Sequence, residues 1–222
     1  SSTSRGLGDV YKRQHLDVKV EVQAGRAAER ILATAEAEQS DLVVLGTESR
    51  SLLTEKLFGS TAISLCQQNK LPVLILRPQL ISTYTVEELD LRCRHLFRYL
   101  LVPYDGSKIS DYLLSQIKQR VTQVTPVLQE CLLLRVIESH DRIDKIMHDS
   151  RIQEAKASLA QAQADLEQLN LKVTTRIEEG ERIPATLRIA MDYDITAIAV
   201  ATDTLGKLAE LSGPSFAGEL LR

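Results

Sequence analysis

Glycine and hydroxyl residues recur in one loop of the chain at a spacing that could hold a phosphate group. The loop begins at Gly46, passes Ser49 and ends at Gly59, Ser60 and Thr61, where a helical pattern starts. Glycine lets a ligand approach the backbone, and the first turn of a helix offers free N–H groups at the positive end of its dipole. Such glycines serve ordinary strand-to-helix turns as often, and Ser60 could act only as an N-cap.

A second group of candidate residues follows two apolar segments in the middle of the chain. Residues 99–105 are apolar at first and end in Asp105, and residues 131–137 form a second apolar run that contains Val136. In open parallel sheets, ligands bind beyond the carboxyl ends of the strands. Asp105 and the backbone near Val136 are therefore candidates for a ligand site.

The elements that position these residues repeat along the chain at a fixed offset of 180 − 25 = 155 residues, without a gap. The aligned residues are identical or similar: Gly25 and Gly180, Leu32 and Leu187, Ala35 and Ala190, Val43 and Ile198, Leu45 and Val200, Thr47 and Thr202, Ser60 and Ser215. A period this long predicts two domains rather than a solenoid. The protein is therefore expected to be a tandem duplication.

Strands and helices alternate in both copies. The pattern predicts a strand at 18–22, a helix at 26–39 and strands at 41–45 and 72–77 in the first copy. In the second copy it predicts strands and helices in turn over 99–105, 109–121, 131–137, 145–169, 171–177, 184–192 and 195–200. Alternation of this kind is typical of an α/β fold with right-handed crossovers and a parallel sheet.

The offset also indicates which elements lack a counterpart. The strand at 72–77 should recur near position 72 + 155 = 227, and the strand at 99–105 should have an earlier counterpart near 99 − 155 = −56. We therefore expect a fragment whose first copy lacks its N-terminal half and whose second copy lacks its last strand. The strand at 18–22 would then have no native neighbour, and its exposed edges would favour association.

These observations divide the chain into four segments. Residues 1–14 carry no hydrophobic periodicity and are expected to be non-native or disordered. Residues 15–78 would form the C-terminal half of the first domain, and residues 79–96 a linker with a short helix at 86–92. Residues 97–222 would form the second domain.

Composition excludes several classes of function. The 222 residues include 27 basic and 30 acidic side chains, a formal charge of −3, which argues against a general nucleic-acid surface. No apolar stretch approaches the roughly 20 residues that span a bilayer, so we expect a cytoplasmic protein without membrane contact. The three cysteines and four histidines show no metal-ligand spacing. Neither a nucleophile with a paired base nor a full P-loop is present, so no catalytic residue is expected.

The glycine loop resembles the Gly-x2-Gly-x9-Gly-(Ser/Thr) loop of the universal stress protein family, with Ser49 in place of the second glycine. Residues 69–77 are similar to the closing strand of that family, and residues 101–107 to its opening strand and aspartate. The resemblance implies an ATP-binding α/β fold with strand order 3-2-1-4-5. The chain would then contain two doubly wound parallel sheets of this kind.

The resemblance also implies roles for individual residues. Asp105 would face the adenine, helped by backbone near Val136, and the loop of the first copy, Gly46 to Thr61, would hold the phosphates. Each copy would thus keep a different half of the site, because the first has no adenine-side strand.

The corresponding phosphate loop of the second copy departs from the family pattern. Its candidate residues are Thr204, Gly213 and Ser215, with Thr204 standing where a glycine is expected. Pro214 falls opposite Gly59 and cannot donate an N–H. ATP binding by this fragment is therefore expected to be weak or lost.

Three classes of function follow, in decreasing order of support. The first is a non-enzymatic stress-response regulator that responds to ATP or a related nucleotide. The second is a tandem scaffold that has lost nucleotide binding, and the third is an ATP-hydrolysing or adenylating α/β enzyme. The resemblance further implies that the two domains pair through their last strands, residues 73–76 in the first copy. Association of two chains into a homodimer is left open.

Overall fold

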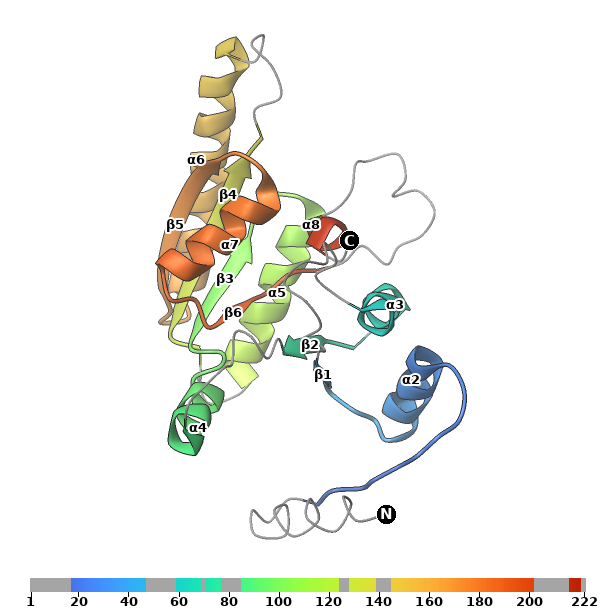
Figure 1. The fold of residues 1–222 in the computed structure, drawn as a ribbon. Helices are drawn as coiled ribbons and strands as arrows, with labels where there is room; N and C mark the ends of the chain where they lie inside the picture. The colour runs from blue at the N-terminus through green and yellow to red at the C-terminus, as the bar shows by residue number, and fades with distance from the viewer. Residues whose placement is uncertain are drawn as a thin grey trace. The chain divides into compact units, whose positions relative to one another are not determined.

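The structure is a computed structural model that describes residues 17–46, 59–68, 71–76, 85–123, 128–138, 145–201 and 216–220. The described residues fall into two compact units, the first ending at Asp41 and the second beginning at Leu42. Strands and helices alternate along the second unit (Figure 1). The segment 1–14, for which a non-native or disordered state is expected, lies outside the described residues.

The first unit contains helix α2, Ala27–Ala37, which lies within the helix predicted at 26–39. The strand predicted at 18–22 is wrong, because residues 17–24 form no strand. Val20 and Val22 are 82% and 96% exposed. A strand needs a neighbour that bonds its N–H and C=O groups, and the structure places no paired strand beside these residues in its described part.

The second unit begins with a small βαβ arrangement. Strands β1, Val43–Gly46, and β2, Val73–Leu76, pair in parallel with Val43 opposite Val73. Helix α3, Ser60–Gln68, connects them and buries Leu65 completely. These two strands correspond to those predicted at 41–45 and 72–77.

A four-stranded parallel sheet forms the larger part of the second unit. Its strands are β3, Tyr99–Pro103; β4, Glu130–Ile137; β5, Lys172–Glu179; and β6, Ala197–Ile198. They lie in the order β5-β4-β3-β6, which is the third, second, first and fourth strand of that sheet in chain order. The predicted α/β fold with parallel sheets is confirmed.

Helices cover both faces of the four-stranded sheet. Helices α5, Lys108–Gln123, and α6, Lys145–Glu167, pack on one face, and helix α7, Arg182–Asp192, packs on the other (Figure 1). Helix α4, Val86–Arg94, lies in the predicted linker, and helix α8, Phe216–Leu220, contacts α7. None of the described helices is both long and apolar enough to cross a bilayer.

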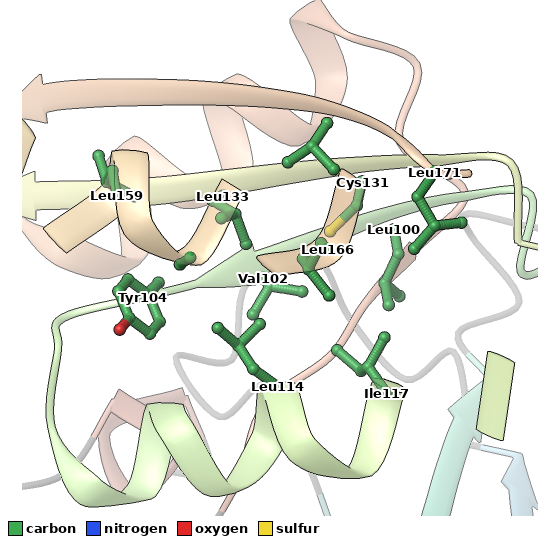
Figure 2. Close-up of a cluster of buried hydrophobic side chains, with 12 residues drawn as sticks. Leu100, Val102, Tyr104, Leu114, Ile117, Cys131, Leu133, Leu159, Leu166 and Leu171 are labelled. Atoms are coloured by element: carbon green, nitrogen blue, oxygen red, sulfur yellow. The ribbon is translucent and has the colours of Figure 1, made fainter. Parts of the chain in front are cut away.

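The core lies against β4, which pairs with β3 on one side and β5 on the other. Leu133 and Cys131 face α5 and α6, and they pack with Leu114 of α5 and with Leu159 and Leu166 of α6 (Figure 2). On the other face, a smaller cluster forms around the following side chains: Leu101, Leu132, Leu134 and Ile189. A strand buried on both faces reads as a continuous apolar run, which explains why 131–137 was predictable.

Two of the described cysteines, Cys93 and Cys131, should differ in reactivity. Cys131 is fully buried, and burial raises the pKa of its thiol to about 12, whereas Cys93 on α4 is exposed. Because the thiolate is the reactive form, iodoacetamide at pH 8 should alkylate Cys93 in the folded protein and spare Cys131. Peptide mass spectrometry would measure this, with the unfolded protein as control. Equal labelling of both cysteines in the folded protein would contradict the burial of β4.

The backbone repeats at the offset found in the sequence. Helices α2 and α7 each have 11 residues, and adding 155 to the bounds of α2 gives the bounds of α7. Gly25 and Gly180 precede them with φ of 130° and 126°, and Gln39 and Asp194 follow them with φ of 50° each. Both segments therefore consist of a glycine turn, a helix of three turns and a left-handed residue.

Candidate functional site

The candidate site lies at the carboxyl edge of the four-stranded sheet, where β3 and β4 end. Pro103 pairs with Leu134, and the Tyr104 N–H donates to the Leu134 carbonyl over 2.9 Å. Continuing this register places Asp105 level with Val136. The structure therefore brings together the two residues that the sequence proposes for the base-binding half of the site.

Asp105 is held by the turn that leads into α5. Its Oδ1 accepts a hydrogen bond of 2.9 Å from the Ser107 N–H. Gly106 lies between them with φ of 73°, a left-handed conformation that favours glycine. Ser107 in turn accepts a hydrogen bond of 3.3 Å from the Ser110 N–H through its hydroxyl, in the manner of an N-cap. The start of α5 thus fixes the position of the Asp105 carboxylate.

The same contacts keep Asp105 ionised. Burial raises the pKa of its carboxyl, but hydrogen bonds from Ser107 and Ser110 and the positive charge of Arg135 lower it, and the net effect is a pKa below the ordinary value. The residue as a whole remains exposed to solvent, although neighbouring groups partly enclose its carboxylate. Asp105 can therefore accept a hydrogen bond from an amino or hydroxyl group of a ligand at neutral pH.

Arg135 brings a positive charge to this edge from within the sheet. It lies on β4, on the same face as Leu133, and its position in the register is level with Tyr104. Its Nε and Nη1 are buried and have no hydrogen-bond partner among the described residues. A buried donor left unpaired costs about 1–3 kcal/mol, so these N–H groups favour an acceptor from a bound molecule or from water. Sequence reasoning missed Arg135, although a charged residue inside an apolar strand is a visible signal.

A second arginine at this edge already forms ion pairs with two carboxylates. Arg182, the first residue of α7, has its Nη2 2.5 Å from Oε1 of Glu219 and its Nε 3.3 Å from Oε1 of Glu138. The contact with Glu138 is an ion pair but not a hydrogen bond, because the Nε finds no acceptor in suitable geometry within the described part. One guanidinium between two carboxylates leaves a net charge of −1, which opposes a phosphate at this place. No sequence pattern indicated these ion pairs, since the three residues lie far apart in the chain.

The described part of the first copy's loop consists of its two ends. Gly46 is the last residue of β1, and Gly59 precedes Ser60 and Thr61, the first residues of α3. Neither glycine has a left-handed φ, and a Cβ added to either would have no atom of a described residue within 4 Å. The described contacts therefore do not require glycine at these positions, and its freedom there suits close approach of a ligand.

The remaining predicted site residues, Ser49, Thr204, Gly213 and Ser215, lie outside the described residues. Over the ranges that the structure describes, no group of three or more histidine, cysteine or acidic side chains could hold a metal ion.

A comparison with known families matched part of the chain. Residues 7–77 match the model of the Universal stress protein family, in a range that begins inside the segment 1–14. No curated protein matches the chain. Residues 7–77 are therefore similar to a domain of the Universal stress protein family.

Two solved structures resemble the chain over 94% of its length. A universal stress protein from Archaeoglobus fulgidus DSM 4304 is 21% identical, with a TM-score of 0.59 and 67% of that chain covered. A protein assigned to the universal stress proteins from Pseudomonas aeruginosa UCBPP-PA14 is 14% identical, with a TM-score of 0.63 and 70% of that chain covered. At these identities the similarity shows a shared fold.

Proposed function

We propose that this protein is a non-enzymatic regulator of the universal stress protein type that responds to ATP or a related nucleotide. One observation carries the proposal: an ionised, exposed carboxylate and unpaired guanidinium donors lie at the same edge of the sheet. Asp105 is an acceptor held by Ser107, and Arg135 offers buried N–H groups without a described partner. A purine with an amino group beside a ring nitrogen presents both a donor and an acceptor to such a pair.

The two copies would contribute different parts of an ATP site. In the second copy, Asp105 and backbone near Val136 would bind the base, while Thr204, Gly213 and Ser215 would replace the usual glycine loop. In the first copy, Gly46, Ser49, Gly59, Ser60 and Thr61 would hold the phosphates. Helix α3 begins at Ser60, and this start supports the role because helix N-termini favour anions.

We propose further that the chain is a tandem pair of domains, each with the strand order 3-2-1-4-5. The shared offset of α2 and α7, with the same glycine turn before them and the same left-handed residue after them, supports the duplication. In such a pair, β2 would contribute to the contact between the copies. We infer a cytoplasmic location from this type of protein.

A scaffold that has lost its nucleotide is the second candidate, and a specific observation favours it. Glu138 and Glu219 both form ion pairs with Arg182, so the charge of this guanidinium is already balanced by carboxylates. A triphosphate approaching this edge would meet a net negative charge. Such a scaffold would keep the fold and would bind other molecules through its surface, without a nucleotide.

Calorimetric titration of the 222-residue chain with ATP and with adenosine tests the proposal. We expect ATP to bind with a dissociation constant in the micromolar range, and we expect phosphate release at the background rate. Failure of both ligands to bind would support the scaffold. Turnover of ATP well above background would contradict the non-enzymatic assignment.

A further inference from the structure

Strand β5 has a long edge that pairs with no other strand in the described part of the chain. It is the outermost of the four strands and has eight residues. The N–H groups of Lys172 and Gly180 point toward β4, because they donate to the carbonyls of Gln129 and Ile137 over 3.1 Å each. Backbone groups alternate sides along a parallel strand, so the N–H and C=O groups of Thr175 and Ile177 point away from β4. They have no backbone partner in the described part of the chain.

Helix α6 covers one face of the sheet but leaves the outer edge of β5 open. A cavity of about 300 Å³ lies between α6 and β5, lined by the following residues: Lys156, Leu159, Ala160, Gln163, Thr175, Arg176 and Ile177. Gln163 donates its amide to the outward carbonyl of Val173 over 3.2 Å. That carbonyl has a second lone pair and can accept another hydrogen bond. The edge is therefore accessible to a further strand.

We propose that β5 pairs antiparallel with β5 of a second copy of this chain, about a two-fold axis at Thr175. In this register, residues whose numbers sum to 350 lie opposite each other. Val173 then faces Ile177 of the second copy, an apolar pair on the α6 side. Lys172 faces Glu178 of the second copy, an opposite-charge pair. Cross-strand pairs of both kinds stabilise antiparallel strands.

Two ion pairs that exist within each copy would extend the pairing between copies. Within one copy, Lys172 Nζ lies 2.8 Å from Glu130 and Arg188 Nη2 lies 3.0 Å from Glu178. The two-fold axis joins these pairs into a row of alternating charges: Glu130, Lys172, and Glu178 and Arg188 of the second copy. A register centred on Arg176 would instead place two arginines face to face, which is unfavourable.

The strand that pairs with this edge is β5 of a second copy, because the sequence of β5 is complementary to its own reversed sequence. A two-fold interface places the same patch on both partners, so a strand must match its own reversed sequence. The run Lys172–Glu179 does so at Lys172, which lies opposite Glu178, and at Val173, which lies opposite Ile177. Pairing also removes an exposed strand edge, which otherwise favours aggregation. The proposal does not depend on nucleotide binding.

Sedimentation equilibrium of the full chain and of Thr175→Pro tests the proposal. The Thr175 N–H points away from β4, so proline removes no hydrogen bond within the sheet but deletes the donor at the two-fold axis. We expect a dimer whose dissociation constant rises at least tenfold in Thr175→Pro. Thr175→Val, which keeps the N–H, should dimerise like the parent. A chain that stays monomeric at all concentrations, or a dimer unaffected by proline, would overturn the proposal.

A cross-linking experiment decides the register even where the proline variant does not fold. In a Cys93→Ser background, Thr175→Cys should form a disulfide between two copies, because opposed residues in a hydrogen-bonded antiparallel pair lie about 5.5 Å apart at Cα. Arg176→Cys in the same background should not link to itself, since its opposite residue is Thr174. Equal linking of both variants, or linking of Arg176→Cys alone, would overturn the register. A monomer that binds extended peptides at this edge would overturn the choice of occupant.

Discussion

Replacing Leu133 with alanine is expected to lower the free energy of unfolding by about 2–5 kcal/mol. Leu133 is completely buried in β4 and packs with side chains of β3, α5 and α6 (Figure 2). Its neighbours belong to three elements that are packed against one another, so they cannot close together into the space that the side chain leaves. The loss therefore includes the cavity as well as the transfer of the removed atoms. Urea unfolding, followed by circular dichroism, would measure it.

Leu91→Ala provides the matched control. Leu91 is 56% exposed on α4, so the same chemical change should alter the free energy of unfolding by no more than about 0.5 kcal/mol. A loss for Leu133→Ala as small as that for Leu91→Ala would show that β4 does not carry the core. Such a result would remove the basis for placing the site at its carboxyl end.

Replacing Asp105 with alanine is expected to weaken ATP binding at least tenfold. The substitution removes the ionised acceptor that the Ser107 N–H holds at the edge of the sheet. A hydrogen bond to a charged group contributes about 1.5–3 kcal/mol, which corresponds to tenfold or more in affinity. Asp105→Asn keeps an acceptor for Ser107 but loses the charge, so its effect separates the charge from the turn. Calorimetry of both variants would measure the change.

Asp192→Ala is the control for this prediction. Asp192 is exposed at the last position of α7, away from the carboxyl edge of the sheet, so ATP affinity should stay unchanged. A melting curve for each variant distinguishes a local loss of the ligand contact from unfolding. If Asp105→Ala binds ATP as tightly as Asp192→Ala does, then Asp105 is not part of the nucleotide site.

The parts of the fold that the sequence predicted are those in which local pattern and tertiary environment agree. The strand predicted at 131–137 appears as β4, and the helix predicted at 145–169 appears as α6 with its end two residues earlier. The strand at 18–22 failed because alternating valines describe a strand only where another strand pairs with it. Val20 and Val22 instead lie exposed.

Only the part of the site formed by residues close together in the sequence was predictable. Asp105 follows a buried strand and precedes a helix, and this order alone indicated the edge of a parallel sheet. The ion pairs of Arg182 with Glu138 and Glu219 were not predictable. Glu138 lies 44 positions earlier in the chain than Arg182, and Glu219 lies 37 positions later. Contacts of this kind depend on how strands and helices pack, not on spacing.

Amide hydrogen exchange of the full chain with and without ATP tests the central claim most directly, because it locates the bound nucleotide. We predict that ATP slows exchange at residues 104–107 and 136–138, at the carboxyl ends of β3 and β4, more than at the buried amides of α7. Binding of ATP without added protection at these residues would contradict a nucleotide site at this edge.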